Sequence, residues 1–510
     1  MDNKPIRIGR AVSGVVVITL IAKLLGFLRE VLLSKYFGAT GISDAYLISQ
    51  NIPGTIFDFV GTGLATSFMP IYYKILDKAG KKEAVKFTNY VINITLIFSL
   101  VVIVLVYLFT PAIIKIFASG FEGQTLKYAE DFTRINIISL IFSTYVYVFT
   151  SYLQANKIFT KSAFAAIPNS ICIMLAIVLG AKVNVYLLSI GSALAVLVQS
   201  IFLFVPAVKA GYRPLAKIKW NDSIKEFFRL LLPVIFGVSV NQINTLVDRT
   251  VASQVAVGGI SALTYANSLI MLVQGGIVQP ISTVFYPQIT ENVTSGDKEK
   301  SAAMVERAIN FLLSILIPIT FGFMAFRTQI TDTLFHRGAF DENATNMTAS
   351  ALMFYAIGIC FVGIRELISR YYYANSNTVI PMRNATIGVI VNIVLNLLFA
   401  KFFGISGLAM ATSISAIVTA ILLWTGCKKS LGTKLKLKYF DLLKVFITSF
   451  IMIIGTLLFS RIVSVNKYVD LLMIILIGVL IYFCVGYLLH LELIFEIIHK
   501  IIKRFHIIKE

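Results

Sequence analysis

Charged side chains lie inside long apolar stretches of this 510-residue chain, where charge is costly. Ionisable residues within membrane-spanning segments usually face a cavity or an ionic partner. Ammonium and guanidinium groups in a water-filled cavity suit an anionic ligand, and guanidinium suits phosphate especially well. The bland alternatives are ion pairs between helices and side chains that extend to the membrane surface. The candidate substrate-binding residues are Lys23, Arg29, Glu30, Asp44, Arg249, Arg365 and Glu366.

A second group of polar residues carries no net positive charge. Asn392 and Asn396 are four residues apart, so they share one helix face, and Thr412 lies in the next apolar stretch. Asp248 could join them to complete a set of hard oxygen ligands for a cation such as Na⁺. Hydrogen bonding between helices is the alternative. No other cofactor is indicated.

The elements that must position these residues are membrane helices. The chain is 57% hydrophobic and only 14% charged, whereas soluble proteins carry roughly 25% charged residues. We count fourteen apolar stretches near the length of about 20 residues that spans a bilayer. The sequence predicts an all-α polytopic membrane protein with 14 transmembrane helices.

The distribution of basic residues predicts the topology. If the N-terminus is cytoplasmic and the spans alternate, most of the 45 Lys and Arg residues fall in inner loops and tails. Both termini are then cytoplasmic, and the basic loops face anionic membrane lipids rather than nucleic acid. Residues 491–510 form a predicted amphipathic basic tail on the inner membrane face.

Three short motifs occur twice at nearly constant offset. Gly-Ile-Ser recurs after 218 residues (259−41), Phe-x-Pro after 217 (285−68) and Tyr-x-x-Ala-Asn after 219 (371−152). The repeat predicts two six-helix lobes, 1–210 and 221–426, around a central cavity, as in transporters. Residues 440–490 are two additional transmembrane helices.

Motifs of enzymes are not evident. The chain has no phosphate-binding Walker motif, and its four cysteines and four histidines show no metal-ligand spacing. A polytopic glycosyltransferase would need acidic or histidine residues in an exposed loop, and the only such loop, near His336, is short. We therefore expect a transporter rather than an enzyme, and a monomer.

Several segments resemble one known family. Residues 24–53 (LLGFLREVLLSKYFGATGISDAYLISQNIP) are similar to the opening of the MurJ/MviN family of lipid II flippases. Segments 334–345, 363–381 and 392–416 continue the resemblance, which covers essentially the whole chain. The family belongs to the multidrug/oligosaccharidyl-lipid/polysaccharide exporter superfamily.

The resemblance implies a function in the bacterial plasma membrane. It implies that an undecaprenyl-diphosphate-linked peptidoglycan precursor moves from the inner to the outer leaflet by alternating access. Lys23 and Arg29 then match cavity cations of the family, Asp44 matches a functional acidic position, and the Asp248 group resembles a sodium site described for some members.

Two positions depart from the family pattern. Asp58 stands where many members have a basic residue, and Ser268 stands where many have arginine. These departures leave a flippase for another polyprenyl-diphosphate-linked oligosaccharide, such as a capsule or sporulation precursor, as the alternative. A cation-coupled small-molecule antiporter is a further alternative, disfavoured because cationic drugs fit poorly beside Lys23 and Arg29.

Overall fold

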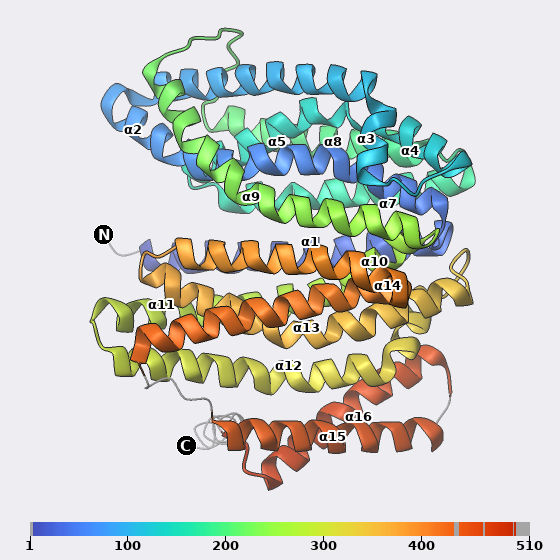
Figure 1. Cartoon of the computed structure of the whole chain (residues 1–510). Coiled ribbons are helices and arrows are strands. Elements are labelled where there is room, and N and C mark those ends of the chain that lie inside the picture. The colour runs from blue at the N-terminus through green and yellow to red at the C-terminus, as the bar shows by residue number, and fades with distance from the viewer. Residues whose placement is uncertain (1–3, 433–437, 463–464, 493, 496–510) are drawn as a thin grey trace. The chain divides into compact units, whose positions relative to one another are not determined.

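The computed structural model describes residues 4–432, 438–462, 465–492 and 494–495 (Figure 1). Helices make up nearly all of these residues, and no strand occurs among them. The chain divides into two compact units. The first unit holds Met1–Ser261 with Arg337–Phe340, and the second holds Ala262–His336 with Asp341–Glu510. The predicted all-α membrane fold is confirmed.

Nine helices build the first unit. They are α1 (Lys4–Phe37), α2 (Gly41–Leu108), α3 (Thr110–Phe117), α4 (Gly123–Asn136), α5 (Ser139–Ala155), α6 (Phe159–Phe164), α7 (Ala166–Lys182), α8 (Leu187–Lys209) and α9 (Asp222–Val255). A 68-residue helix such as α2 would be about 100 Å long, which is far more than one bilayer. Its backbone breaks at Gly80, where φ is 79°, so α2 supplies two antiparallel spans.

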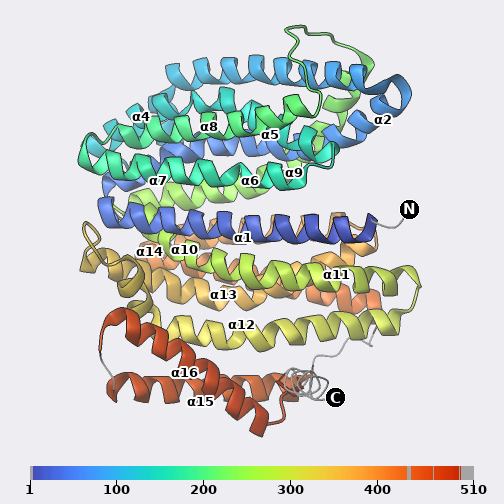
Figure 2. The same ribbon diagram turned by 180° about the vertical axis from the view of Figure 1, so that it is seen from behind.

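The second unit contains the remaining helices, which Figure 2 shows from behind. They are α10 (Gly259–Val273), the π-helical turn η1 (Gln274–Val278), α11 (Gln279–Thr294), α12 (Lys298–Phe335), α13 (Glu342–Ala374), α14 (Val379–Leu431), α15 (Tyr439–Ile462) and α16 (Lys467–Leu488). Like α2, the 53-residue α14 breaks at a glycine, Gly404, with a positive φ of 57°.

Within the described residues, nine helices are long and apolar enough to cross a membrane, or ten if the bent pair α4–α5 forms one span. Because α2 and α14 each contain two spans, ten becomes twelve. The helices α1 and α9, of 34 residues each, are long enough for two more, so the arrangement is consistent with the fourteen predicted. The extra pair predicted at 440–490 corresponds to α15 and α16.

Two asparagines of α2 form hydrogen bonds to the segment between α8 and α9. Asn89 Oδ1 accepts hydrogen bonds from the hydroxyl of Tyr212 and the amide of Leu215, both at 2.8 Å. Asn93 donates to the carbonyls of Leu215 and Lys217 at 2.9 Å. The following helix α9, which the repeat assigns to the second lobe, packs on α2 and lies in the first compact unit. The lobes 1–210 and 221–426 stay a prediction about the repeat.

The predicted basic tail, 491–510, lies almost entirely outside the described residues. Of its described residues, Leu491 and Ile494 are buried.

Candidate functional site

Arg29 and Glu30, neighbours on α1, form an ion pair. Nη2 of Arg29 lies 3.0 Å from Oε1 of Glu30, and Nε lies 3.3 Å from the same oxygen. The Arg29 side chain keeps 30% of its surface exposed, whereas Glu30 is buried. The Arg29 side chain therefore keeps surface that a ligand can contact.

Arg29 lines a cavity of about 1010 Å³ within the first unit. Residues of α1, α2, α5, α7 and α8 form most of its walls, and α1 lies beside α6 and α7 in Figure 2. Arg29 is the one charged side chain among the described lining residues. The polar lining also includes Gln50, Asn136, Ser143, Tyr147, Thr150, Gln154, Asn169, Ser192 and Gln199. This lining suits a ligand with an anionic group and many hydrogen-bonding groups.

A polar stripe on α5 supplies much of that wall. Ser143, Tyr147, Thr150 and Gln154 follow one another at intervals of four, three and four residues, so they share one helix face. The Tyr147 ring packs against α2 where Gly61 has no side chain, and it stacks on Phe57 at 5.8 Å between ring centres. Sequence reasoning missed this stripe, although its helical spacing was visible.

Asp44 makes a buried contact with the backbone of residues 258–261. Its carboxylate is buried and accepts hydrogen bonds from the amides of Gly258 and Ser261, both at 2.8 Å. It thus caps the N-terminus of α10, where backbone donors lack partners. A direct contact of Asp44 with substrate stays a prediction.

Lys23, Asp248 and Arg249 are half-buried residues of the first unit. Lys23 lies on α1, six residues before Arg29, and is not among the described residues that line the cavity. Asp248 and Arg249 lie on α9, and Asn244 donates to Asp248 at 3.4 Å. Substrate binding by Lys23 and Arg249 and ion binding by Asp248 stay predictions.

On α13, no hydrogen bond joins the candidate substrate-binding residues Arg365 and Glu366 within the described part of the chain. Glu366 instead binds Arg370, one turn later, at 2.7 Å. Arg370 also donates to Ser282 at 3.3 Å and lies 5.4 Å from the ring centre of Tyr286. Sequence reasoning missed Arg370, which stands near the end of its span.

The predicted ion ligands of the second unit form a hydrogen-bonded chain on α14. The Asn396 amide donates to Oδ1 of Asn392 at 2.9 Å, and Asn392 donates to the hydroxyl of Thr412 at 3.3 Å. Both asparagines are buried. Amide and hydroxyl oxygens fit a hard cation such as Na⁺ in chemical type. Asp248 belongs to the first unit, so its participation stays a prediction.

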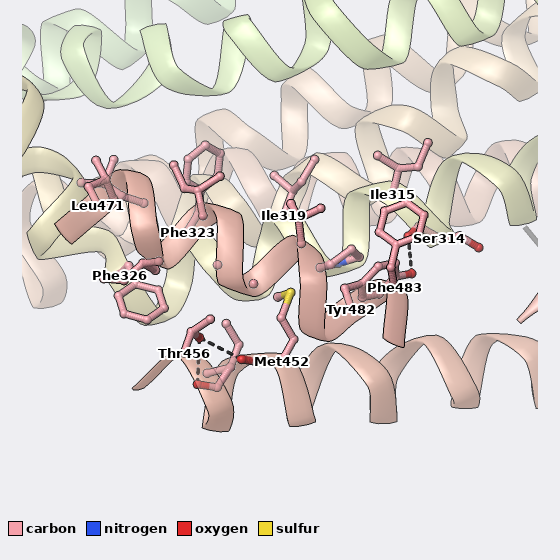
Figure 3. Close-up of a pocket in the computed structure, with 18 residues that line it drawn as sticks. Ser314, Ile315, Ile319, Phe323, Phe326, Met452, Thr456, Leu471, Tyr482 and Phe483 are labelled. Atoms are coloured by element: carbon pink, nitrogen blue, oxygen red, sulfur yellow. Dashed lines mark hydrogen bonds between the residues drawn. The ribbon is translucent and has the colours of Figure 1, made fainter. Parts of the chain in front are cut away.

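An apolar groove of about 480 Å³ lies between α12, α15 and α16 in the second unit (Figure 3). Pro318 of α12 lacks the amide hydrogen that would bind the carbonyl of Ser314. The hydroxyl of Tyr482, on α16, donates to that carbonyl at 2.6 Å. This bond ties α16 to α12 at one end of the groove, beside Ser314 in Figure 3.

Comparison with known proteins identifies the family. The family model described as lipid II flippase MurJ matches residues 33–479. The chain belongs to this family. The probable lipid II flippase MurJ of Thermotoga maritima is 28% identical over 485 residues, covering 94% of this chain and 97% of that protein. The lipid II flippase MurJ of Burkholderia cenocepacia is 26% identical over 435 residues, covering 82% and 84%.

Solved structures agree with this assignment to the MurJ family. A structure titled lipid II flippase MurJ, inward closed conformation, matches with a TM-score of 0.82 and 29% identity, covering 94% of this chain and 99% of that one. An inward-facing multidrug resistance transporter of the MATE family matches with a TM-score of 0.70 at 14% identity, covering 82% and 98%, and shows the shared fold alone. The resemblance noted in the sequence is confirmed.

Proposed function

We propose that this chain moves lipid II, the lipid-linked peptidoglycan precursor, from the inner to the outer leaflet of the bacterial plasma membrane by alternating access. Membership of the MurJ family supports this function. The observation that carries the mechanism is the accessible guanidinium of Arg29 in a large polar cavity. Guanidinium binds phosphate oxygens through paired hydrogen bonds, so Arg29 is suited to hold the diphosphate.

The polyprenyl tail of the substrate has a matching surface in the second unit. The groove between α12, α15 and α16 is lined almost entirely by apolar side chains, among them Ile319, Phe323 and Leu471 (Figure 3). The tail already lies in bilayer hydrocarbon, so the groove would hold it by van der Waals contact and shape rather than by transfer out of water. We assign this groove to the tail, which gives α15 and α16 a role in substrate binding.

Na⁺ remains our proposal for the coupling ion, held by Asn392, Asn396 and Thr412 with Asp248. Replacing Asn396 with leucine should then abolish any stimulation of transport by Na⁺ over K⁺, at unchanged expression. Equal transport by this variant in both salts, with Na⁺ stimulation kept in the Asn375→Leu control, supports the site. Stimulation that survives Asn396→Leu would reject it.

Other features of the proposed protein follow from the sequence. We expect a monomer with both termini in the cytoplasm, surrounded by anionic lipids at its basic inner loops, and no catalytic activity. The alternative substrate, another polyprenyl-diphosphate-linked oligosaccharide, rests on Asp58 and Ser268. Ser268 donates to the carbonyl of Tyr265 at 2.6 Å, and the side chain of Asp58 lies outside the described part of the chain.

Complementation tests the proposal. The chain would replace the sole lipid II flippase of a depletion strain, and growth and surface-accessible lipid II would be measured. We expect the wild type and the exposed control Lys225→Ala to rescue, and Arg29→Ala to fail at equal membrane expression. A well-expressed wild type that does not rescue would exclude lipid II as the substrate and favour another lipid-linked glycan.

A further inference from the structure

Three carboxamide side chains of the first unit line its cavity. Gln154 lies on α5, Asn169 on α7 and Gln199 on α8, and all three line the same space as Arg29. Each is half-buried, and within the described part of the chain none has a side-chain hydrogen bond. Each offers two N–H donors and one carbonyl acceptor to a ligand.

Two other carboxamides that line this cavity, Gln50 and Asn136, form hydrogen bonds between helices. Gln50 donates to the hydroxyls of Tyr46 and Ser192 at 2.6 and 3.0 Å. Asn136 donates to the hydroxyl of Ser49 at 2.9 Å. These bonds hold α2 against α8 and α4, which is sufficient to explain why Gln50 and Asn136 are polar. The same explanation does not apply to Gln154, Asn169 and Gln199.

Gln199 lies away from the cation. Arg29 lies eight residues before the end of α1, and Gln50 lies nine residues after the start of α2, so both are about equally far from the turn that joins these helices. Ser192 binds Gln50 at this level, and Gln199 follows Ser192 by seven residues on α8. Two helical turns separate those residues by about 10 Å. The cavity therefore extends from a cationic end at Arg29 to a neutral region at Gln199.

The neutral region suits a sugar better than a second phosphate. Hydroxyl and acetamido groups of a sugar both donate and accept hydrogen bonds, as carboxamides do. The stacked rings of Phe57 and Tyr147 add flat apolar surface at the wall. The volume of about 1010 Å³ stands at the upper end of small-ligand pockets, roughly 300–1,000 Å³, so the space admits more than a diphosphate.

We propose that Gln154, Asn169 and Gln199 form a subsite that recognises an acetamido-bearing sugar of the lipid-linked substrate. This subsite rests on the proposed function and deepens it, because it assigns the glycan to the inside of the first unit. Arg29 holds the diphosphate, and the carboxamides distinguish a glycan-bearing lipid from the same lipid without sugar.

Binding to two lipids tests the subsite. The full chain in nanodiscs would be titrated with lipid II and with undecaprenyl diphosphate, which shares the tail and diphosphate but has no sugar. We expect Asn169→Leu and Gln199→Leu each to weaken lipid II binding about tenfold, the loss of one good hydrogen-bonded pair. Binding of undecaprenyl diphosphate should change less than twofold.

Controls separate this proposal from its alternatives. Arg29→Ala should weaken binding of both lipids, and Gln124→Leu, an amide on the exposed face of α4, should change neither. Leucine variants that weaken both lipids equally, or neither, would overturn the subsite while leaving the flippase function intact. A wild type that binds undecaprenyl diphosphate but gains nothing from the glycan would also overturn it. A wild type that binds neither lipid would reject the proposed function, and the subsite with it.

Discussion

The hydroxyls of Ser43 and Ser261 lie 2.9 Å apart and form a hydrogen bond. These serines occupy the same position of the repeated Gly-Ile-Ser motif, 218 residues apart (261−43). Asp44 adds bonds to the amides of Gly258 and Ser261 beside them. The motif that reveals the repeat in the sequence is thus the place where the two copies bind each other.

Replacing Asp44 with alanine should destabilise the protein substantially. The buried amides of Gly258 and Ser261 would lose a charged acceptor, which we expect to cost about 3 kcal/mol. Thermal unfolding in detergent would measure the loss. Asp222→Ala, at a fully exposed side chain, is the matched control and should unfold like the wild type. An Asp44→Ala protein as stable as this control would show that the cap contributes little.

A second pair of contacts repeats with the same offset. The amide of Gly120 donates to the hydroxyl of Ser253 at 3.0 Å, and the amide of Ala339 donates to the carbonyl of Lys35 at 2.9 Å. Gly120 and Gly338 are 218 residues apart, as are Lys35 and Ser253 (338−120 and 253−35). Each glycine sits so close to the backbone opposite that a Cβ atom would overlap a carbonyl oxygen.

Alanine at Gly120 or Gly338 should therefore force these contacts apart. Gly338 also has a φ of 65°, so Gly296→Ala, at a φ of 73° with open space around it, controls for backbone strain. Gly26→Ala on α1, with open space and no positive φ, is the control for Gly120. We expect both contact variants to lower the melting temperature more than their controls. If each contact variant had the same melting temperature as its control, the close approach of these glycines would not contribute to stability.

The sequence predicted the helices, the family and the repeat because long apolar stretches and spaced motifs are local signals. The Arg29–Glu30 pair was predictable for the same reason, since its members are neighbours. The hydrogen bonds of Asp44 were not predictable from the sequence, because their donors are backbone amides 214 and 217 residues away (258−44 and 261−44). The polar stripe on α5 was not predicted because Ser, Thr and Tyr residues are common in membrane helices, where they form hydrogen bonds between helices.

The Glu366–Arg370 pair should show measurable coupling. Removing Arg370 leaves a carboxylate in an apolar stretch without its partner, so Arg370→Leu should destabilise the wild type more than the Glu366→Gln background. A double-mutant cycle in detergent should give roughly 1–2 kcal/mol of coupling. The cycle of Glu366 with Arg365, which forms no hydrogen bond to it within the described residues, should give less. Equal coupling in both cycles would contradict the observed pairing.

The hydroxyl of Tyr482 should stabilise the folded protein only when residue 318 is proline. In the wild type, the carbonyl of Ser314 has the Tyr482 hydroxyl as its donor because Pro318 lacks an amide hydrogen. Tyr482→Phe therefore leaves a half-buried acceptor without this donor, at a cost of about 1 kcal/mol. Pro318→Ala restores the helical donor to the same carbonyl. In that background Tyr482→Phe should cost little, and thermal unfolding of the four proteins measures the difference. A loss of the same size in both backgrounds would mean that the Tyr482 hydroxyl stabilises the protein in a way that does not depend on the missing amide hydrogen of Pro318.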